Sequence, residues 1–185
     1  MATQQQPKYW TYDDLLDLPD EGKRYEIIEG ELYEMPSPSM AHGDLIANLL
    51  HRILWPVVEP LGGRVYTAPI DVFMLDANPV QPDIFVLLPE QFGLKSKRGV
   101  EGAPALVVEV LSPSNPEHDR IVKRALYARA GVPEYWIVSP EAAIVEILIL
   151  DGTVYRTHAR IAGDEPLASP TFPTLTVAAS AVFTA

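Results

Sequence analysis

The chain contains, at residues 105–111, the stretch Ala105-Leu106-Val107-Val108-Glu109-Val110-Leu111, an apolar run interrupted by one acidic residue. Such a run is typical of a strand at the centre of a sheet, buried on both faces. An unpaired carboxylate in that position would cost several kcal/mol. We therefore expect Glu109 to be neutralised, paired or bound to a cation.

A second acidic residue begins another apolar stretch, Gln81-Pro82-Asp83-Ile84-Phe85-Val86-Leu87-Leu88, and lies 26 residues before Glu109. If the two strands meet at one sheet edge, their carboxylates converge. Mg²⁺ is held by such a set, with one or two carboxylates, a backbone carbonyl and waters. The alternative is that each acid caps a strand or pairs with an arginine.

Regular patterning extends outward from these two strands over the whole chain. We predict a hairpin over 24–35, a helix from 39 that ends or kinks at Pro56, strands within 64–75, 81–88 and 105–111, a helix over 116–130, a strand over 134–138, a hairpin over 143–161 and a last strand over 175–183. This order predicts one α/β (α+β) domain over residues 1–185. Its central mixed β-sheet is flanked by helices and carries an N-terminal β-hairpin and a C-terminal β-hairpin extension.

Composition excludes several classes of site. There is no cysteine, so disulfides, zinc fingers and iron–sulfur centres are excluded. No apolar run approaches the ~20 residues of a membrane span, and residues 1–10 lack a signal-peptide core, so we expect a cytoplasmic protein without membrane contact. The net charge of −11 argues against general DNA coating but leaves room for a local basic groove.

Further candidates flank the two acids. Lys123 follows Glu109 on the next predicted helix, with Asp119 and Tyr127 one turn before and after it. From spacing alone, an Asp119–Lys123 surface pair is the favoured interpretation. His42, near the start of the first long helix, is a candidate base or phosphate contact. Asp71 is a further possible ligand. The acids of the first hairpin alternate in strand register and are mostly expected to be solvated: Glu26, Glu29, Glu31 and Glu34.

Taken together, these residues resemble the PD-(D/E)XK nuclease superfamily. Pro82-Asp83 matches the first half-motif and Glu109 the acidic position of the second, but Leu111 stands where that motif has lysine. Over nearly its full length the chain resembles one branch, the Uma-two family of restriction endonucleases. The matching stretches are 12–15, 24–32, 36–38 with His42, 81–84, 107–114, Asp119 with Lys123 and Tyr127, and 134–138.

The resemblance implies a Mg²⁺- or Mn²⁺-dependent endonuclease that hydrolyses phosphodiester bonds in DNA. Asp83, Glu109 and the carbonyl of Val110 would hold the metal, and Lys123 would replace the missing motif lysine. His42 is a fourth candidate catalytic residue. Possible accessory residues are Glu29, Asp71 and Tyr127, and a local DNA-binding surface is expected from Lys95, Lys97, Arg98, Arg120 and Arg124.

Binding both strands of a duplex through such short basic loops suggests a homodimer. Two alternatives stay open: a degenerate nuclease fold that binds nucleic acid or a protein partner, and a metal enzyme for a small phosphoester. Leu111 and the net charge favour the first alternative.

Overall fold

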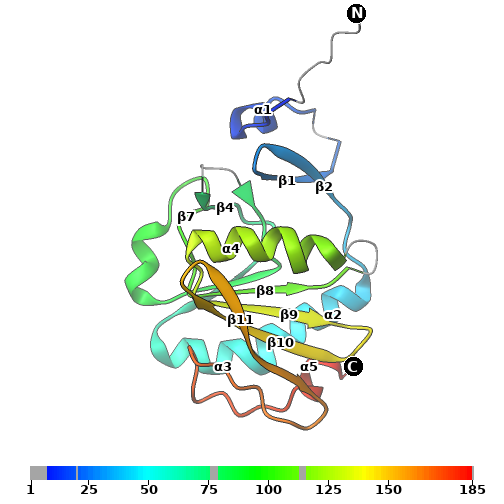
Figure 1. Cartoon of the computed structure of the whole chain (residues 1–185), viewed down its shortest axis with the longest axis vertical. Coiled ribbons are helices and arrows are strands. Elements are labelled where there is room, and N and C mark those ends of the chain that lie inside the picture. Colours follow the sequence, from blue (N-terminus) through cyan, green and yellow to red (C-terminus); the bar gives the residue numbers. More distant parts are fainter. Residues whose placement is uncertain (1–7, 20, 76–78, 113–115, 185) are drawn as a thin grey trace, which may run out of the picture.

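A six-stranded mixed sheet with the strand order β11-β10-β9-β8-β6-β3 lies at the centre of the computed structural model, which describes residues 8–19, 21–75, 79–112 and 116–184 (Figure 1). Its strands are β3 (Arg64–Thr67), β6 (Ile84–Leu87), β8 (Leu106–Val110), β9 (Glu134–Ser139), β10 (Ile144–Asp151) and β11 (Val154–Ala162). Strands β8 and β9 are parallel, and the other neighbours are antiparallel. The predicted mixed α/β sheet is thus present.

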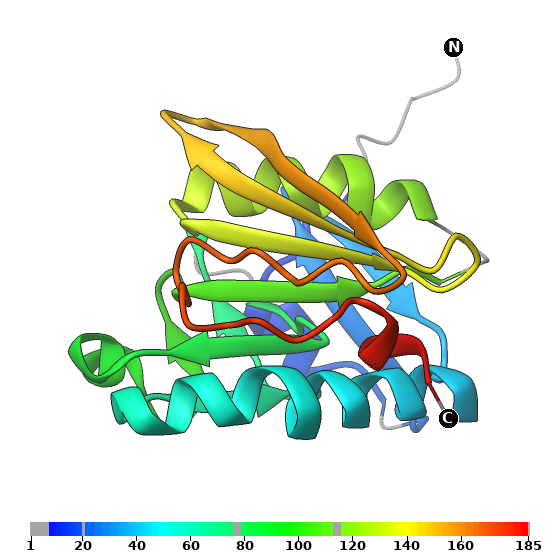
Figure 2. The ribbon, with the colours of Figure 1, turned by 90° about the horizontal axis from the view of Figure 1, so that it is seen from below.

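Helices cover both faces of this sheet, as Figure 2 shows. Helix η5 (His118–Lys123) with α4 (Arg124–Ala130) covers one face, and α2 (Met40–Asn48), η1 (Leu49–Leu54) and α3 (Trp55–Val58) cover the other. Successive residues of β8 belong to opposite cores: Val107 belongs to the core that contains Leu126, and Val108 to the core that contains Leu49. Strand β8 is therefore buried on both faces, as its continuous apolar run predicts.

The first long helix begins as predicted but does not end at Pro56. The Ser39 hydroxyl accepts the backbone N–H of His42, which caps α2. The chain is π-helical through η1, and Pro56 then lies in the first turn of α3, where a missing N–H is tolerated. The helix ends after η2 (Glu59–Leu61), at Gly62 with a φ of 73°.

The predicted N-terminal hairpin consists of β1 (Arg24–Ile28) and β2 (Glu31–Met35), preceded by the short helix α1 (Tyr12–Leu16). Its two-residue turn has positive φ at both Glu29 (54°) and Gly30 (77°), as a tight hairpin requires. Figure 1 shows this hairpin above α4, on the side of that helix away from β10 and β11.

One predicted strand stretch is divided in the structure, and another is wrong. The 64–75 stretch is divided into β3 and β4 (Val72–Phe73), which belong to different sheets, because Pro69 has no N–H to continue a ladder. Strand β4 pairs with β5 (Pro79–Val80) and β7 (Val100–Glu101), and η4 (Pro89–Leu94) precedes β7. The 175–183 stretch ends in a short helix, α5 (Ser180–Phe183), and its alanines favour helix over strand.

The remaining elements follow the prediction. Residues 116–130 are helical and end at Gly131, which has a φ of 83°. The β10–β11 hairpin turns at Asp151 and Gly152. Residues 113 and 114, at the end of the matching stretch 107–114, lie outside the described part of the chain. No helix in the described ranges is long and apolar enough to cross a lipid bilayer.

Candidate active site

Asp83 directly precedes β6 and Glu109 lies on the neighbouring strand β8, and crossed hydrogen bonds link the two acids. Strands β6 and β8 pair Ile84 with Val108, so Asp83 and Glu109 come next to each other at one end of the pair. The backbone N–H of Asp83 donates to Glu109 Oε2 (3.3 Å), and that of Val110 donates to Asp83 Oδ2 (2.8 Å). Each carboxylate is thus fixed by the strand that carries the other.

Glu109 is almost completely buried, with 2% of its surface exposed, and three donors surround it. Besides the N–H of Asp83, its Oε1 accepts from Lys123 Nζ (3.0 Å) and from the hydroxyl of Tyr127 (2.6 Å). Burial raises the pKa of Glu109 well above its ordinary value, and the positive charge of Lys123 opposes this rise. The carboxylate is paired, as its apolar sequence context requires.

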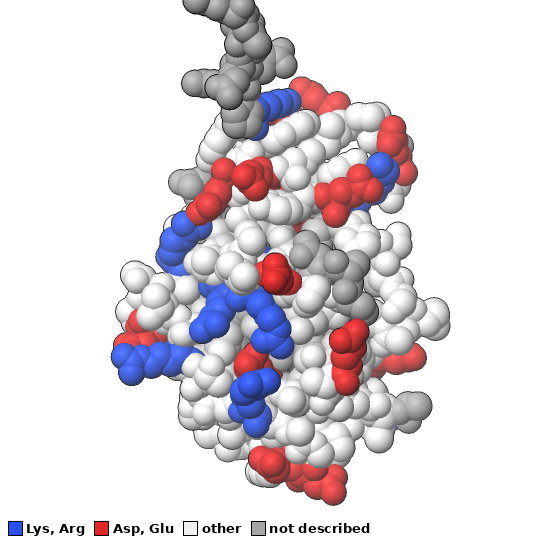
Figure 3. All heavy atoms as spheres, turned by 45° about the vertical axis from the view of Figure 1, so that its right-hand side comes forward, with Lys and Arg blue, Asp and Glu red and all other residues white. Residues whose placement is uncertain are grey.

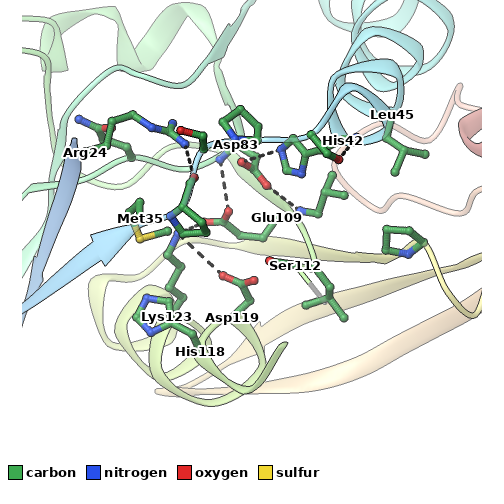
Figure 4. Close-up of a pocket in the computed structure, with 18 of the residues that line it drawn as sticks. Arg24, Met35, His42, Leu45, Asp83, Glu109, Ser112, His118, Asp119 and Lys123 are labelled. Carbon is green, nitrogen blue, oxygen red and sulfur yellow. Dashed lines mark hydrogen bonds and ion pairs between the residues drawn. The ribbon is translucent and has the colours of Figure 1, made fainter. Parts of the chain in front are cut away.

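Lys123 is buried rather than at the surface, so the spacing-based interpretation of a surface pair with Asp119 is wrong. Its exposed fraction is 1%, and its Nζ lies 3.8 Å from Asp119 Oδ1. Burial alone would lower the pKa of Lys123, but the surrounding acids, Glu109 first among them, raise it overall. The lysine is therefore held as an ammonium between carboxylates. Figure 4 shows it approaching Glu109 from the η5 side.

The family lysine position is filled by apolar packing. Leu111 is 7% exposed and belongs to the core on the η5–α4 face. Lys123 comes from the helix that covers that same face and reaches Glu109 from there. An ammonium therefore occupies the acid site although the strand position carries leucine.

Glu26 is the site residue that the sequence reasoning missed. It was expected to be solvated with the other hairpin acids, yet it is fully buried and its Oε1 lies 3.1 Å from Lys123 Nζ. The burial pattern of β1 gives the reason, because Ile27 and Ile28 are buried directly after Glu26. Glu26 has the same sequence feature as Glu109, because in both cases an acidic residue stands beside apolar strand residues.

His42 approaches Asp83 from the α2 side (Figure 4). The cap at Ser39 fixes the first turn of α2, and His42 Nε2 lies 3.2 Å from Asp83 Oδ1. The hydrogen bond that His42 donates to Asp83 raises the pKa of His42 above its ordinary value, against the opposing effect of burial. The predicted candidate residue therefore lies within reach of the first acid.

These groups line one cavity of about 710 Å³. Of the two predicted acids, Asp83 is the more accessible, with 20% of its side chain exposed, whereas Glu109 lies deeper. The cavity wall is completed by apolar residues from β2, α2 and the segments near them, among them Met35, Pro36, Pro38, Leu45 and Pro140. The arrangement places the carboxylates of Asp83 and Glu109, the ammonium of Lys123 and the imidazole of His42 at a single concave surface.

Of the possible accessory residues, only Tyr127 belongs to this cluster. Glu29, in the hairpin turn, is exposed and pairs with Arg129. Asp71 accepts a hydrogen bond from Gln81 Nε2 (2.9 Å) but lines a different hollow. The prediction of Glu29 and Asp71 as site residues therefore finds no support in the positions of their side chains.

The basic residues predicted to bind DNA fall into two separate groups. Lys95, Lys97 and Arg98 line the second hollow, of about 360 Å³. Arg120 is paired with Glu146 (2.7 Å), and Arg124 donates to the carbonyl of Tyr155 (3.0 Å). On the face seen in Figure 3, basic side chains gather near the middle with acidic side chains around them.

The acid pair fits a hard cation by the chemistry of its donors. In the described ranges no three His, Cys, Asp or Glu side chains form a complete metal-binding cluster. Mg²⁺, however, commonly takes only one or two carboxylates and keeps several waters. Each oxygen of Asp83 and Oε2 of Glu109 accepts one hydrogen bond in the interactions above, and a carboxylate oxygen has two lone pairs. Acceptor capacity therefore remains on both acids.

The backbone carbonyl of Val110 also suits the binding of a hard cation. On the register of β6 and β8, the position opposite Val110 is Pro82, which has no N–H to donate. Val110 lines the cavity together with both acids. Its carbonyl is therefore a reasonable third oxygen donor.

Comparison with known proteins places these features in a family. Residues 12–180 match the model of the Uma2 (Uma-two) family, described as "Putative restriction endonuclease". No curated protein matches. Among solved structures, the fold is similar to that of a putative nuclease belonging to DUF820 from Anabaena variabilis, with a TM-score of 0.75 and 20% identity over 92% of this chain and 96% of that one. The family match spans both acids, Lys123 and His42, and the chain belongs to the Uma2 family.

Proposed function

We propose that the protein is a metal-dependent endonuclease that hydrolyses phosphodiester bonds in DNA. The observation that carries the proposal is the position of Lys123, whose ammonium lies 3.0 Å from Glu109 while the other oxygen of Glu109 accepts the N–H of Asp83. Two acids and a lysine thus meet at one cavity, although the strand position usual for the lysine holds Leu111.

Each residue has a separate role in this proposal. Asp83, Glu109 and the carbonyl of Val110 would hold Mg²⁺ or Mn²⁺ through oxygen atoms. A divalent ion there supplies Lewis acidity, which lowers the pKa of a bound water and neutralises charge on the phosphate. Lys123 contributes a fixed positive charge beside the acids, where charge develops on the reacting phosphate.

His42 would act at the accessible side of the acid pair. Its ring reaches Asp83 Oδ1, and both residues line the cavity. A raised pKa favours the imidazolium, which can donate a hydrogen bond to a phosphate oxygen. We assign His42 to phosphate contact on that basis.

DNA is proposed to meet the protein at the loop that carries Lys95, Lys97 and Arg98. Asp71 and Gln81 connect that hollow to the catalytic cavity, since Gln81 lines the cavity and bonds Asp71. Arg98, Arg120 and Arg124 are weaker candidates than the two lysines, because Glu101, Glu146 and the carbonyl of Tyr155 already bind them. Cleavage of both strands would suit a homodimer, and we keep the homodimer as part of the proposal.

The test is cleavage of supercoiled plasmid DNA in Mg²⁺ or Mn²⁺. We expect nicked or linear product from the wild-type protein and none from the Asp83→Ala/Glu109→Ala double variant. The matched control is Asp17→Ala/Glu141→Ala, which removes two exposed acids and should cleave like the wild type. Equal cleavage by the Asp83→Ala/Glu109→Ala variant would show that these acids are not the site.

A second candidate function is binding without cleavage. Leu111 at the motif lysine position and the net charge of −11 favour it. In that case the protein retains nucleic acid or a protein partner but shows no divalent-ion affinity. A third candidate, hydrolysis of a small phosphoester, is favoured by the apolar wall around Met35 and Leu45. Faster turnover of a chromogenic phosphodiester than of plasmid would identify it.

A further inference from the structure

Glu26 makes two contacts through a single carboxylate oxygen. Its Oε1 lies 3.1 Å from Lys123 Nζ and accepts the backbone N–H of Gln81 at 2.7 Å. Gln81 is two residues before Asp83 in the same segment. One oxygen of the hairpin therefore links the lysine of η5 to the strand that carries the first acid.

The three N–H donors of Lys123 show how the contact with Glu26 orients the ammonium. An ammonium has three N–H donors on a flexible four-carbon stem. Glu109 and Glu26 lie within 3.0 and 3.1 Å of Nζ, while Asp119 lies at 3.8 Å, beyond a hydrogen bond. Two fixed partners define the direction of the third N–H, and Lys123 lines the cavity.

The hairpin also holds η5 through a second pair of contacts. His118 packs against Tyr33 of β2, with ring centroids 4.5 Å apart. His118 Nε2 lies 3.7 Å from Glu26 Oε2, and both atoms are buried without a hydrogen-bond partner among the described residues. These two atoms are complementary to each other, so Glu26 faces η5 with both of its oxygens.

We propose that Glu26 is the positioning residue for Lys123, and that the β1–β2 hairpin completes the catalytic site by docking this carboxylate against η5. The inference rests on the proposed nuclease function for its catalytic meaning, while the positioning itself is a property of the protein alone. Without Glu26, Lys123 keeps Glu109 but loses the contact that ties it to the segment leading to Asp83.

The experiment measures acetylation of Lys123 by an amine-reactive ester in metal-free wild-type protein and in Glu26→Gln, with each lysine quantified by mass spectrometry. Exposed Lys97 is the internal standard, and Glu31→Gln on the same hairpin is the matched control. We expect Lys123 to react at least about tenfold faster in Glu26→Gln than in the wild type, because a buried ion pair is broken. Lys97 should be unchanged in every variant.

If Lys123 is acetylated as slowly in Glu26→Gln as in the wild type, the proposal is overturned. If Glu26→Gln does not fold by circular dichroism, Glu26→Asp replaces it, since a carboxylate withdrawn by one methylene should also free Lys123. Wild-type protection in Glu26→Asp then overturns the proposal.

Kinetics give the second readout. In the plasmid assay, Glu26→Gln should lower kcat by about 100-fold with little change in KM, because the lysine acts in the chemical step. An effect on KM alone contradicts positioning for catalysis. If the wild type cleaves nothing, the nuclease proposal fails, and the acetylation result still decides whether Glu26 positions Lys123.

Discussion

At the scale of single residues, the site joins buried charges, Glu26, Glu109 and Lys123, to the partly exposed pair of Asp83 and His42. Glu109 could be predicted to be one of these buried charges, because every neighbour in its strand is apolar. Glu26 stands beside apolar Ile27 and Ile28, but alternation along the hairpin does not identify Lys123 as the partner that it contacts. The sequence shows that a buried acid needs a partner. It does not show which side chain is that partner.

The hydroxyl of Tyr127 should be worth more than an ordinary hydrogen bond, because it donates to a buried carboxylate. We expect Tyr127→Phe to lower the free energy of unfolding by about 1.5–3 kcal/mol, measured by urea denaturation. Tyr155→Phe is the matched control, because its hydroxyl donates to the neutral carbonyl of Val132 and should cost about 0.5–1.5 kcal/mol. Equal losses in the two variants would argue against a charged acceptor at Tyr127.

His42 should titrate above the ordinary histidine range because Asp83 stabilises its imidazolium form. The stability from this pair is fully present below the unfolded pKa of about 6.5 and is lost as the pH rises through the folded pKa. We expect Asp83→Asn to lower the pKa of His42, followed by NMR of the ring in metal-free protein. Asp17→Asn should leave the titration as in the wild type, and an unchanged titration in Asp83→Asn would contradict the contact.

At the scale of elements, strand and helix types were predictable where local chemistry decides them. The 24–35 hairpin, the β10–β11 hairpin and the helix over 116–130 all follow from turn residues and apolar spacing. The division of 64–75 between two sheets depends on tertiary pairing of β4 with β5 and β7, which no local pattern encodes. The positions of Lys123 and His42 at the acids depend in the same way on helix packing.

Helix α2 presents His42 from its first turn, so its cap should matter to stability. We expect Ser39→Ala to lower the free energy of unfolding by about 1 kcal/mol, because the N–H of His42 loses its acceptor. Ser37→Ala, two residues earlier and outside any helix, should change it by less than about 0.5 kcal/mol. A loss no larger in Ser39→Ala than in Ser37→Ala would mean that the cap contributes nothing.

At the scale of the whole molecule, part of the excess negative charge is concentrated at the candidate site. Glu26, Asp83, Glu109 and Asp119 lie near one buried lysine. A divalent cation at the acid pair would reverse the sign of the field where a phosphate must lie. DNA association should therefore be weak, salt-sensitive and dependent on the divalent ion.

The most direct measurement is calorimetric titration of the protein with Mg²⁺ and with Mn²⁺, comparing the wild type with Asp83→Asn and with the exposed control Asp17→Asn. The account predicts that the wild type and Asp17→Asn bind the ion and that Asp83→Asn binds at least about tenfold more weakly. A wild type without divalent-ion affinity, or an Asp83→Asn variant that binds as tightly as the wild type, would contradict it.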